Sequence, residues 1–349
     1  MKDERTLNET DITTVVDRPL GGKKSVIMDS QILTSLMKCP RLTDFRFNLN
    51  LISLDGKSNS LECGSIVHKF LEVYYNSQIN GLSKEKAEGF GYAAANLYIQ
   101  GCKFCTDFHP FTTDDPTQPG VIINVAKPVC GHKVNEYPGV KNTPKDSEGY
   151  KLGWTYVLDT IAQYLEYWKN DYWVPLETEV TKGRQLYEDA DIRVIWKAKF
   201  DLIVDTNKGI YPEDHKTMKQ NKTTLSLNNQ FMGQALLMGT QSVIINKIGF
   251  QKTLEPKEKF IRPMINFSTE RLLEWQSEIL PYYAKLLVMY AENGYFPPNY
   301  ESCEGRYGNC SFTKVCEGNP SDRQRLLQEG FIVGPAWDIS NTDESENGD

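Results

Sequence analysis

The segment from residue 197 to residue 220 reads KAKFDLIVDTNKGIYPEDHKTMKQ and constrains the fold more than any other part of the chain. Apolar and polar side chains alternate over residues 200–205, as they do in a half-buried strand. Asn207-Lys208-Gly209 is a turn signal, and a second strand follows over residues 210–216. The sequence therefore predicts a β-hairpin, around which we expect the rest of the fold to be organised.

The predicted hairpin carries two carboxylates and a lysine. Side chains two residues apart share a face of a strand, so Asp214 and Lys216 project the same way and His215 projects the other way. If the strands pair, Asp201 comes near the face of Asp214 and Lys216. Carboxylates are ligands that Mg²⁺ and Mn²⁺ prefer, and a lysine can stabilise developing negative charge. The set predicts a metal-assisted hydrolytic site; the alternative is a solvated hairpin.

Two further residues could belong to the same site. A helix is predicted from residue 63 onward, and in its Gly64-x-x-x-His68 motif glycine permits close packing one turn before an imidazole that could bind metal. Another helix is predicted over residues 225–238. Glu179 lies in a predicted strand that precedes the hairpin. The alternatives are a structural histidine and an exposed strand carboxylate.

The remaining periodic segments predict an α/β fold. With 349 residues, 40% of them hydrophobic, the chain can bury a large core in one elaborated domain or two. Helices are predicted at 30–37, 82–101, 153–170, 268–292 and 323–328, and further strands at 173–180, 192–206, 243–248 and 259–267.

The chain has eight cysteines. Cys303, Cys310 and Cys316 are separated by six and five residues, and a cluster of this kind indicates metal binding. Three ligands are one short of a closed site, and Cys39 could supply the fourth. A second group could bind zinc, with loop or core cysteines as the alternative; its members are Cys102, Cys105, Cys130 and His132.

The order of these motifs resembles the PD-(D/E)XK nuclease superfamily. Asp201 followed by Asp214-His215-Lys216 matches the acid and the (D/E)-x-K triplet, and Gly64-x-x-x-His68 matches the first motif of the RecB-like branch. Gln230 matches the start of that branch's Q-x-x-x-Y motif, although position 234 is Gln rather than Tyr. One early cysteine and three late ones resemble the iron–sulfur nucleases, which include AddB-type subunits and CRISPR-associated exonucleases with a [4Fe–4S] cluster.

The resemblance implies a restriction-endonuclease-like central mixed sheet flanked by helices, with a helical insertion at about 80–150. An iron–sulfur staple formed by Cys39 and residues 303–316 would join the chain ends, although zinc would accept the same ligands. The nuclease domain would span residues 26–317. Residues 1–25 would be a flexible lead-in, and residues 318–349 a helix and an acidic tail.

The resemblance also implies a Mg²⁺- or Mn²⁺-dependent deoxyribonuclease, with exonuclease activity expected before endonuclease activity. His68, Asp201 and Asp214 would bind the metal, with the backbone carbonyl of His215 as a further ligand. Lys216 would assist the attacking water. Gln230 would position DNA or the lysine.

DNA is the expected partner, in recombination, repair or phage DNA metabolism, and any unwinding would come from a helicase or recombination partner supplied in trans. The formal net charge of −7 argues against a general nucleic-acid coat protein. The alternative function is a non-cleaving iron–sulfur or zinc protein that binds DNA or acts as a scaffold. The polar amino terminus and the lack of a transmembrane-length apolar run predict a cytoplasmic protein, in the host cytoplasm if phage-encoded.

Overall fold

The computed structural model describes residues 16–17, 23–54, 59–100, 108–112, 122–126, 154–218, 227–305 and 308–339. The zinc hypothesis for Cys102, Cys105, Cys130 and His132 lies outside these residues, as does the acidic tail from residue 340 onward. No helix in the described ranges combines the length and apolar character needed to cross a membrane.

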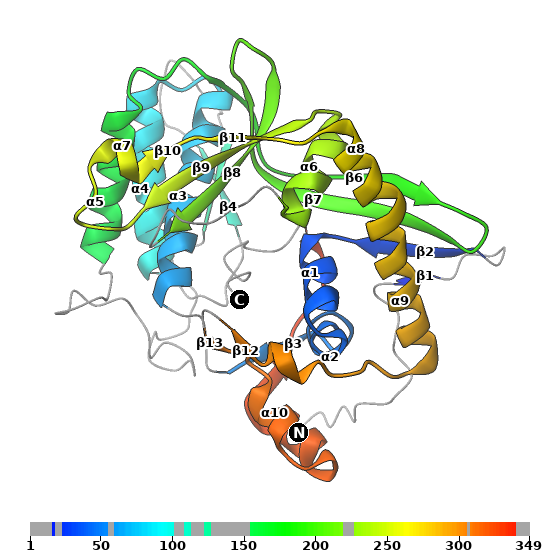
Figure 1. Cartoon of the computed structure of the whole chain (residues 1–349). Coiled ribbons are helices and arrows are strands. Elements are labelled where there is room, and N and C mark those ends of the chain that lie inside the picture. The colour runs from blue at the N-terminus through cyan, green and yellow to red at the C-terminus, as the bar shows by residue number, and fades with distance from the viewer. Residues whose placement is uncertain are drawn as a thin grey trace.

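The chain has a mixed α/β architecture built on a central sheet (Figure 1). The main path of this sheet runs β1-β2-β7-β8-β9-β10, while β6 pairs with β7 and β11 pairs with β9. The pairs β2–β7 and β8–β9 are parallel and the others are antiparallel, so the predicted mixed sheet is confirmed. Its strands are β1 (Val16–Asp17), β2 (Lys24–Met28), β6 (Val174–Glu188), β7 (Ile192–Asp205), β8 (Ile210–Met218), β9 (Ser242–Gly249), β10 (Phe260–Ile261) and β11 (Met264–Asn266).

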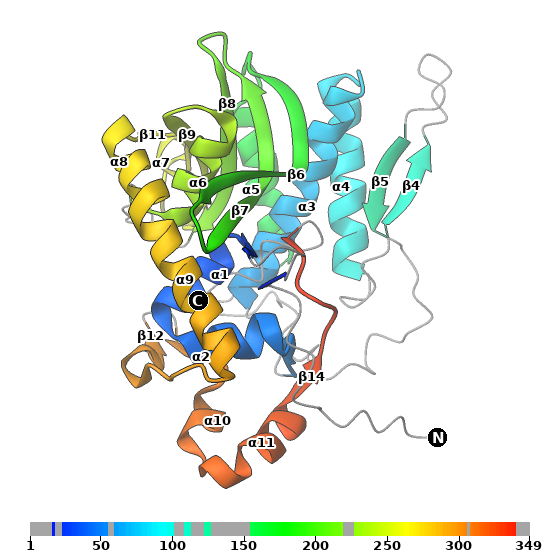
Figure 2. The ribbon, with the colours of Figure 1, turned by 90° about the vertical axis from the view of Figure 1, so that its right-hand side faces the viewer.

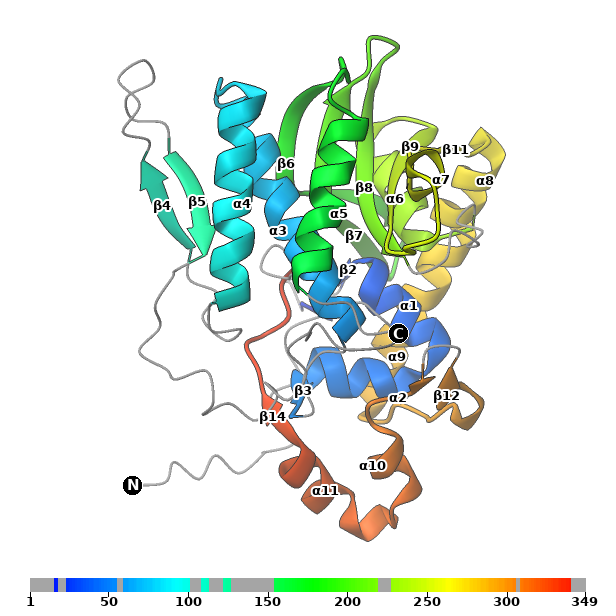
Figure 3. The ribbon, with the colours of Figure 1, turned by 90° about the vertical axis from the view of Figure 1, so that its left-hand side faces the viewer.

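Helices cover both faces of the sheet (Figures 2 and 3). On one face α3 (Asn59–Ile79), α4 (Lys84–Gln100) and α5 (Trp154–Tyr167) pack through a buried cluster that includes Phe70 and Ile161. On the other face lie α1 (Ser30–Lys38), α6 (Asn229–Met238), α8 (Thr269–Glu274), the π-helical turn η4 (Trp275–Ile279) and α9 (Leu280–Asn293). Trp196 and Trp275 meet edge to face in this second cluster.

Smaller elements complete the described chain. They are α2 (Pro40–Thr43), the π-helix η1 (Asp44–Asn48), β3 (Leu51–Ser53), β4 (Phe108–Thr112), β5 (Ile122–Ala126), α7 (Pro256–Lys259), the 3₁₀ turns η5 (Tyr300–Ser302) and η6 (Pro320–Asp322), β12 (Glu304–Gly305), β13 (Gly308–Asn309), α10 (Thr313–Glu317), α11 (Arg323–Gly330) and β14 (Phe331–Val333). The late elements β12, α10 and α11 lie beside α2 and β3, so residues 40–53 and residues 304–331 are neighbours (Figure 1).

Local sequence explains where the helices beside the site begin and how closely they approach the sheet. Asp29 caps α1 by accepting hydrogen bonds from the backbone N–H groups of Gln31 and Ile32. A Cβ on Gly64 of α3 would lie 3.0 Å from Thr217 of β8. A Cβ on Gly233 of α6 would lie 2.1 Å from the Trp196 indole nitrogen. Each glycine therefore permits a helix to lie close against the sheet.

Three predicted boundaries are wrong. β2 places residues 24–25 inside the sheet, because β2 pairs in parallel with β7, so the lead-in cannot extend to residue 25. The strand predicted over residues 259–267 is two short strands, β10 and β11, both antiparallel to β9. The strand that contains Glu179 continues to Glu188, beyond the predicted end, because it pairs along the length of β7.

Candidate active site

Three residues on separate elements place ligand atoms within 4.8 Å of one another. They are His68 from α3, Glu179 from β6 and Asp201 from β7, and we call them the cation group. Asp201 is only 1% exposed, and its Oδ2 lies 3.6 Å from Nδ1 of His68. Two carboxylates and an imidazole are suitable ligands for a divalent cation such as Mg²⁺ or Mn²⁺.

Glu179 belongs to this group because of an irregular backbone. Its φ is +51° in the middle of β6, a conformation that non-glycine residues seldom adopt. The neighbouring register pairs are Thr178 with Leu202 and Val180 with Phe200, so Glu179 stands opposite Asp201. The Thr178 hydroxyl donates to the Asp201 carbonyl oxygen at 2.8 Å, which secures the strand at this point. Backbone strain held by surrounding pairing is a feature of functional sites.

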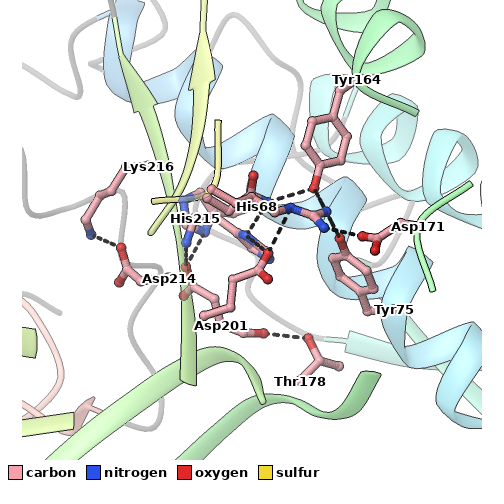
Figure 4. A network of polar contacts seen from close by, with 12 residues as sticks. His68, Tyr75, Tyr164, Asp171, Thr178, Asp201, Asp214, His215 and Lys216 are labelled. Carbon is pink, nitrogen blue, oxygen red and sulfur yellow. Dashed lines mark hydrogen bonds and ion pairs between the residues drawn. The ribbon is translucent and has the colours of Figure 1, made fainter. Parts of the chain in front are cut away.

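Asp214 and Lys216 lie near Asp201 (Figure 4), and together with Gln230 they form a second set. Lys216 Nζ lies 3.0 Å from Asp214 Oδ2, which confirms that the two side chains share a face of β8. Gln230 donates to Asp214 Oδ1 at 2.7 Å and accepts from Lys216 at 3.3 Å. Asn228 caps α6 and thereby fixes the position of Gln230. Asp214, which was expected to bind the metal, is not a member of the cation group. Glu179 is the third member, together with His68 and Asp201.

Asp201 links the two sets through β8. Pairing between β7 and β8 ends at Leu202 with Glu213. Beyond this pair, the side chain of Asp201 rather than the backbone of β7 contacts β8. Its Oδ2 accepts a hydrogen bond from the backbone N–H of His215 at 2.6 Å. The carboxylate of Asp201 is therefore fixed relative to the Asp214-His215-Lys216 triplet.

The His215 side chain lies on the opposite face, as predicted, in a buried polar network (Figure 4). Its ring stacks on Tyr75, and its Nδ1 lies 3.0 Å from the amide nitrogen of Asn246. That amide also donates to the Tyr164 hydroxyl at 2.7 Å. Burial lowers the pKa of His215 well below its ordinary value, and the nearby His68 and Arg262 lower it further. His215 is therefore neutral, which agrees with Nδ1 accepting from Asn246.

Arg262 and Glu213 complete this network and were missed by the sequence reasoning. Arg262 forms an ion pair with Asp171, donates to Tyr164 at 2.6 Å and lies 3.8 Å from Glu213. Its guanidinium also lies 4.2 Å from the ring centroid of Trp168. Burial raises the pKa of Glu213, while Arg262 opposes that rise. No sequence signal joins residues so distant along the chain; only the position of Glu213, directly before the triplet, gave a hint.

Two lysine–carboxylate pairs flank the cation group. Lys199 lies 2.6 Å from Oε2 of Glu179, and Lys69 pairs with Glu72 on α3. Burial raises the pKa of Glu72 to about 7, and the negative charge of Glu179 contributes to the rise. The surroundings of the cation group therefore hold charges of both signs at low exposure.

Four cysteines lie far from this site in the sequence but share one cavity. Cys39, Cys303, Cys310 and Cys316 line it together with Phe45 and Phe312, whose ring centroids are 4.9 Å apart. We call it the cysteine cavity. The backbone N–H of Asn299 donates to Sγ of Cys39 at 3.3 Å. Burial raises the pKa of the Cys303 thiol, and the neighbouring Cys316 and Cys39 add to the rise.

The donor set of the cysteine cavity fits a metal group with four thiolate ligands. Zn–S bonds of 2.3 Å in a tetrahedron place sulfurs about 3.8 Å apart. In the described part of the chain, which includes all four cysteines, the cation group is the only set of three ligand residues within 4.8 Å. A cluster that carries each thiolate on a different iron spaces its ligands more widely. In the described residues the four sulfurs are therefore not gathered as closely as the ligands of a single zinc ion.

Comparison with known proteins gives little guidance. No family model matches the chain, and no curated protein matches it. Among solved structures, the protein described as SSO0001 is similar at 15% sequence identity and a TM-score of 0.29, over 47% of this chain and 70% of that one. A similarity this weak carries no functional argument.

Proposed function

We propose that the protein is a metal-dependent deoxyribonuclease with a restriction-endonuclease-like fold of the PD-(D/E)XK type. One observation carries the proposal: His68, Glu179 and Asp201 converge, and Asp201 is hydrogen-bonded to the backbone of the triplet whose Lys216 is held by Asp214 and Gln230. Cation ligands next to an oriented ammonium group suit the hydrolysis of a phosphodiester. The reaction has to produce a nucleophile and stabilise charge on a phosphate, and this pairing addresses both needs.

Each residue has a role that follows from its contacts. His68, Glu179 and Asp201 would hold Mg²⁺ or Mn²⁺, which when bound lowers the pKa of a coordinated water and polarises the phosphate. Lys216 orients the attacking water or stabilises negative charge on the phosphate. Gln230 and Asp214 keep the Lys216 ammonium in position. The hydrogen bond from His215 to Asp201 keeps the two sets in register.

The cysteine cavity supports a structural [4Fe–4S] cluster as part of the same proposal, with Zn²⁺ as the alternative occupant. Its ligands would be Cys39 from the start of the domain and Cys303, Cys310 and Cys316 from its end. Such a cluster would join the two chain ends, which already meet through Phe45 and Phe312. No redox step is required of it.

The test is a cleavage assay on end-labelled linear and circular DNA, single- and double-stranded, with Mn²⁺, Mg²⁺ or EDTA. We expect metal-dependent loss of linear DNA with circles spared, as for an exonuclease, and a fall of about 100-fold or more for Lys216→Ala. Cleavage of circular DNA would show that the activity is that of an endonuclease rather than an exonuclease. Cleavage that survives both EDTA and Lys216→Ala would contradict the assignment of this site.

A non-cleaving DNA-binding or scaffold protein is the second candidate. The observation that favours it is the position of Asp214, which is engaged by Lys216 and Gln230 and lies outside the cation group. Metal-independent DNA binding with no cleavage in any lane, by protein that retains its metal cluster, would support this candidate.

A further inference from the structure

One carboxylate of the cation group already has a cationic partner. Oε2 of Glu179 lies 2.6 Å from Nζ of Lys199, and the side chains are 19% and 10% exposed. Lys199 stands two residues before Asp201 on β7, so the two residues share a strand beside the cation group. Glu179 is therefore placed either to form an ion pair with Lys199 or to bind a metal ion.

The charges near Glu179 show why its carboxylate cannot bind the Lys199 ammonium and a divalent cation equally well at the same time. Glu72, Glu179 and Asp201 contribute three carboxylates, and Lys69 and Lys199 contribute two ammonium groups. His68 adds an imidazole. A divalent cation on Glu179 and Asp201 would lie within a few ångströms of the Lys199 ammonium, where like charges repel strongly at low exposure. Lys199 and a bound cation therefore compete for Glu179.

Displacement would leave the Lys199 ammonium close to the cation. The nearby Glu72 is already paired with Lys69, and Asp201 would hold the cation, so a further anion would stabilise the displaced ammonium. If the proposed function is right, the substrate supplies this anion. A phosphate bound at the cation would lie within reach of Lys199, because Lys199 has just left Glu179, a ligand of that cation. A lysine is well suited to this exchange, since its flexible stem can reorient a point charge.

We propose that Lys199 neutralises Glu179 in the cation-free protein, is displaced when a divalent cation binds, and then contacts a phosphate of the nucleic acid. The first part concerns only this chain and a cation. The second part rests on the proposed function. Lys199 is thus a positioning residue for metal binding and a substrate contact once metal is present.

The cation part is tested by titrating the purified full-length protein with Mn²⁺ and measuring free Mn²⁺ by electron paramagnetic resonance. We expect Lys199→Met to bind Mn²⁺ at least about fivefold more tightly than wild type, because the competing ammonium is gone. Lys199→Arg, which keeps the charge, should bind as wild type does. Lys182→Met is the matched control. Lys182 lies on β6, the strand of Glu179, and it forms an ion pair with Glu177, which is not in the cation group. Unchanged or weaker Mn²⁺ binding by Lys199→Met would overturn the proposal.

The phosphate part is tested by binding of a labelled oligonucleotide in Ca²⁺, which occupies oxygen-ligand sites, over a range of salt concentrations. We expect Lys199→Met to weaken binding several-fold and to reduce the salt slope by about one. Binding identical to wild type would overturn this part. If wild type binds and cleaves no DNA while the Mn²⁺ effect persists, the proposed function fails and the exchange at Glu179 stands. Lys199→Gln, measured beside thermal melts, replaces Lys199→Met if the latter does not fold.

Discussion

The cation group and the cysteine cavity differ in what holds their residues in place. Around Asp201, strand pairing, the His215 N–H and the Thr178 hydroxyl fix the backbone and the carboxylate. Around the cysteines, the contacts are an apolar wall and the backbone hydrogen bonds of short turns and of the β12–β13 pair, such as that from the Cys310 N–H to the Cys303 carbonyl oxygen. The first region is built by the fold, so its geometry should not depend on the proposed cation. The second should depend for its order on the metal group proposed for it.

The largest expected effect of this difference is on the cysteine cavity. With the proposed [4Fe–4S] cluster in this cavity, Cys316→Ser should abolish the visible absorbance near ~400 nm and lower Tm by about 5 °C or more, because a metal group held by four thiolates would contribute to folding. Spectra and thermal melts of anaerobically purified protein check this. Cys63→Ala is the control, because Cys63 lies in α3 outside the cavity. Equal Tm values for Cys316→Ser and wild type would contradict the expectation that the cysteine cavity, unlike the cation group, depends on a metal group for its order.

A smaller effect is expected in the network behind the cation group. Arg262 is 4% exposed at its side chain and faces two carboxylates, Asp171 and Glu213. Arg262→Gln should lower the free energy of unfolding by about 3 kcal/mol, because it leaves buried charge uncompensated. Urea unfolding measures the change. Arg325→Gln, which breaks an exposed pair with Glu329, should change stability little; equal losses for the two variants would contradict the role of the network.

The smallest effect is a pH dependence set by His215. Its folded-state pKa lies well below the unfolded value of about 6.5, so its neutral form stabilises the fold above that pH and the contribution is lost as pH falls. The difference in Tm between wild type and His215→Gln should therefore shrink from pH 7.5 to pH 5.5. Thermal melts in EDTA, which exclude protonation coupled to metal, measure it. A difference that grows towards low pH would contradict a neutral buried His215.

Local patterns predicted the parts of the site that lie close together in the sequence. The hairpin, the shared face of Asp214 and Lys216, the opposite face of His215 and the cap at Asp29 all follow from strand periodicity and capping chemistry. Gln230 was placed by its motif, and it meets both Asp214 and Lys216.

Features that depend on register or distant packing could not be predicted. The sequence alone leaves Glu179 as either a site residue or an exposed strand carboxylate, because its place opposite Asp201 depends on a positive φ, which strand alternation does not reveal. β2 was missed because parallel pairing with β7 joins segments more than 160 residues apart. Arg262 was missed for the same reason, since its partners come from α5, β8 and the residues before β6.

The central claim is that Glu179, rather than Asp214, completes the cation group with His68 and Asp201. The most direct test is Mn²⁺ binding by Glu179→Gln and Asp214→Asn, measured by titration calorimetry on protein with its cysteine cavity intact. The account predicts that Glu179→Gln loses binding at least about tenfold while Asp214→Asn binds nearly as wild type does. Loss of binding in Asp214→Asn with retention in Glu179→Gln would contradict it.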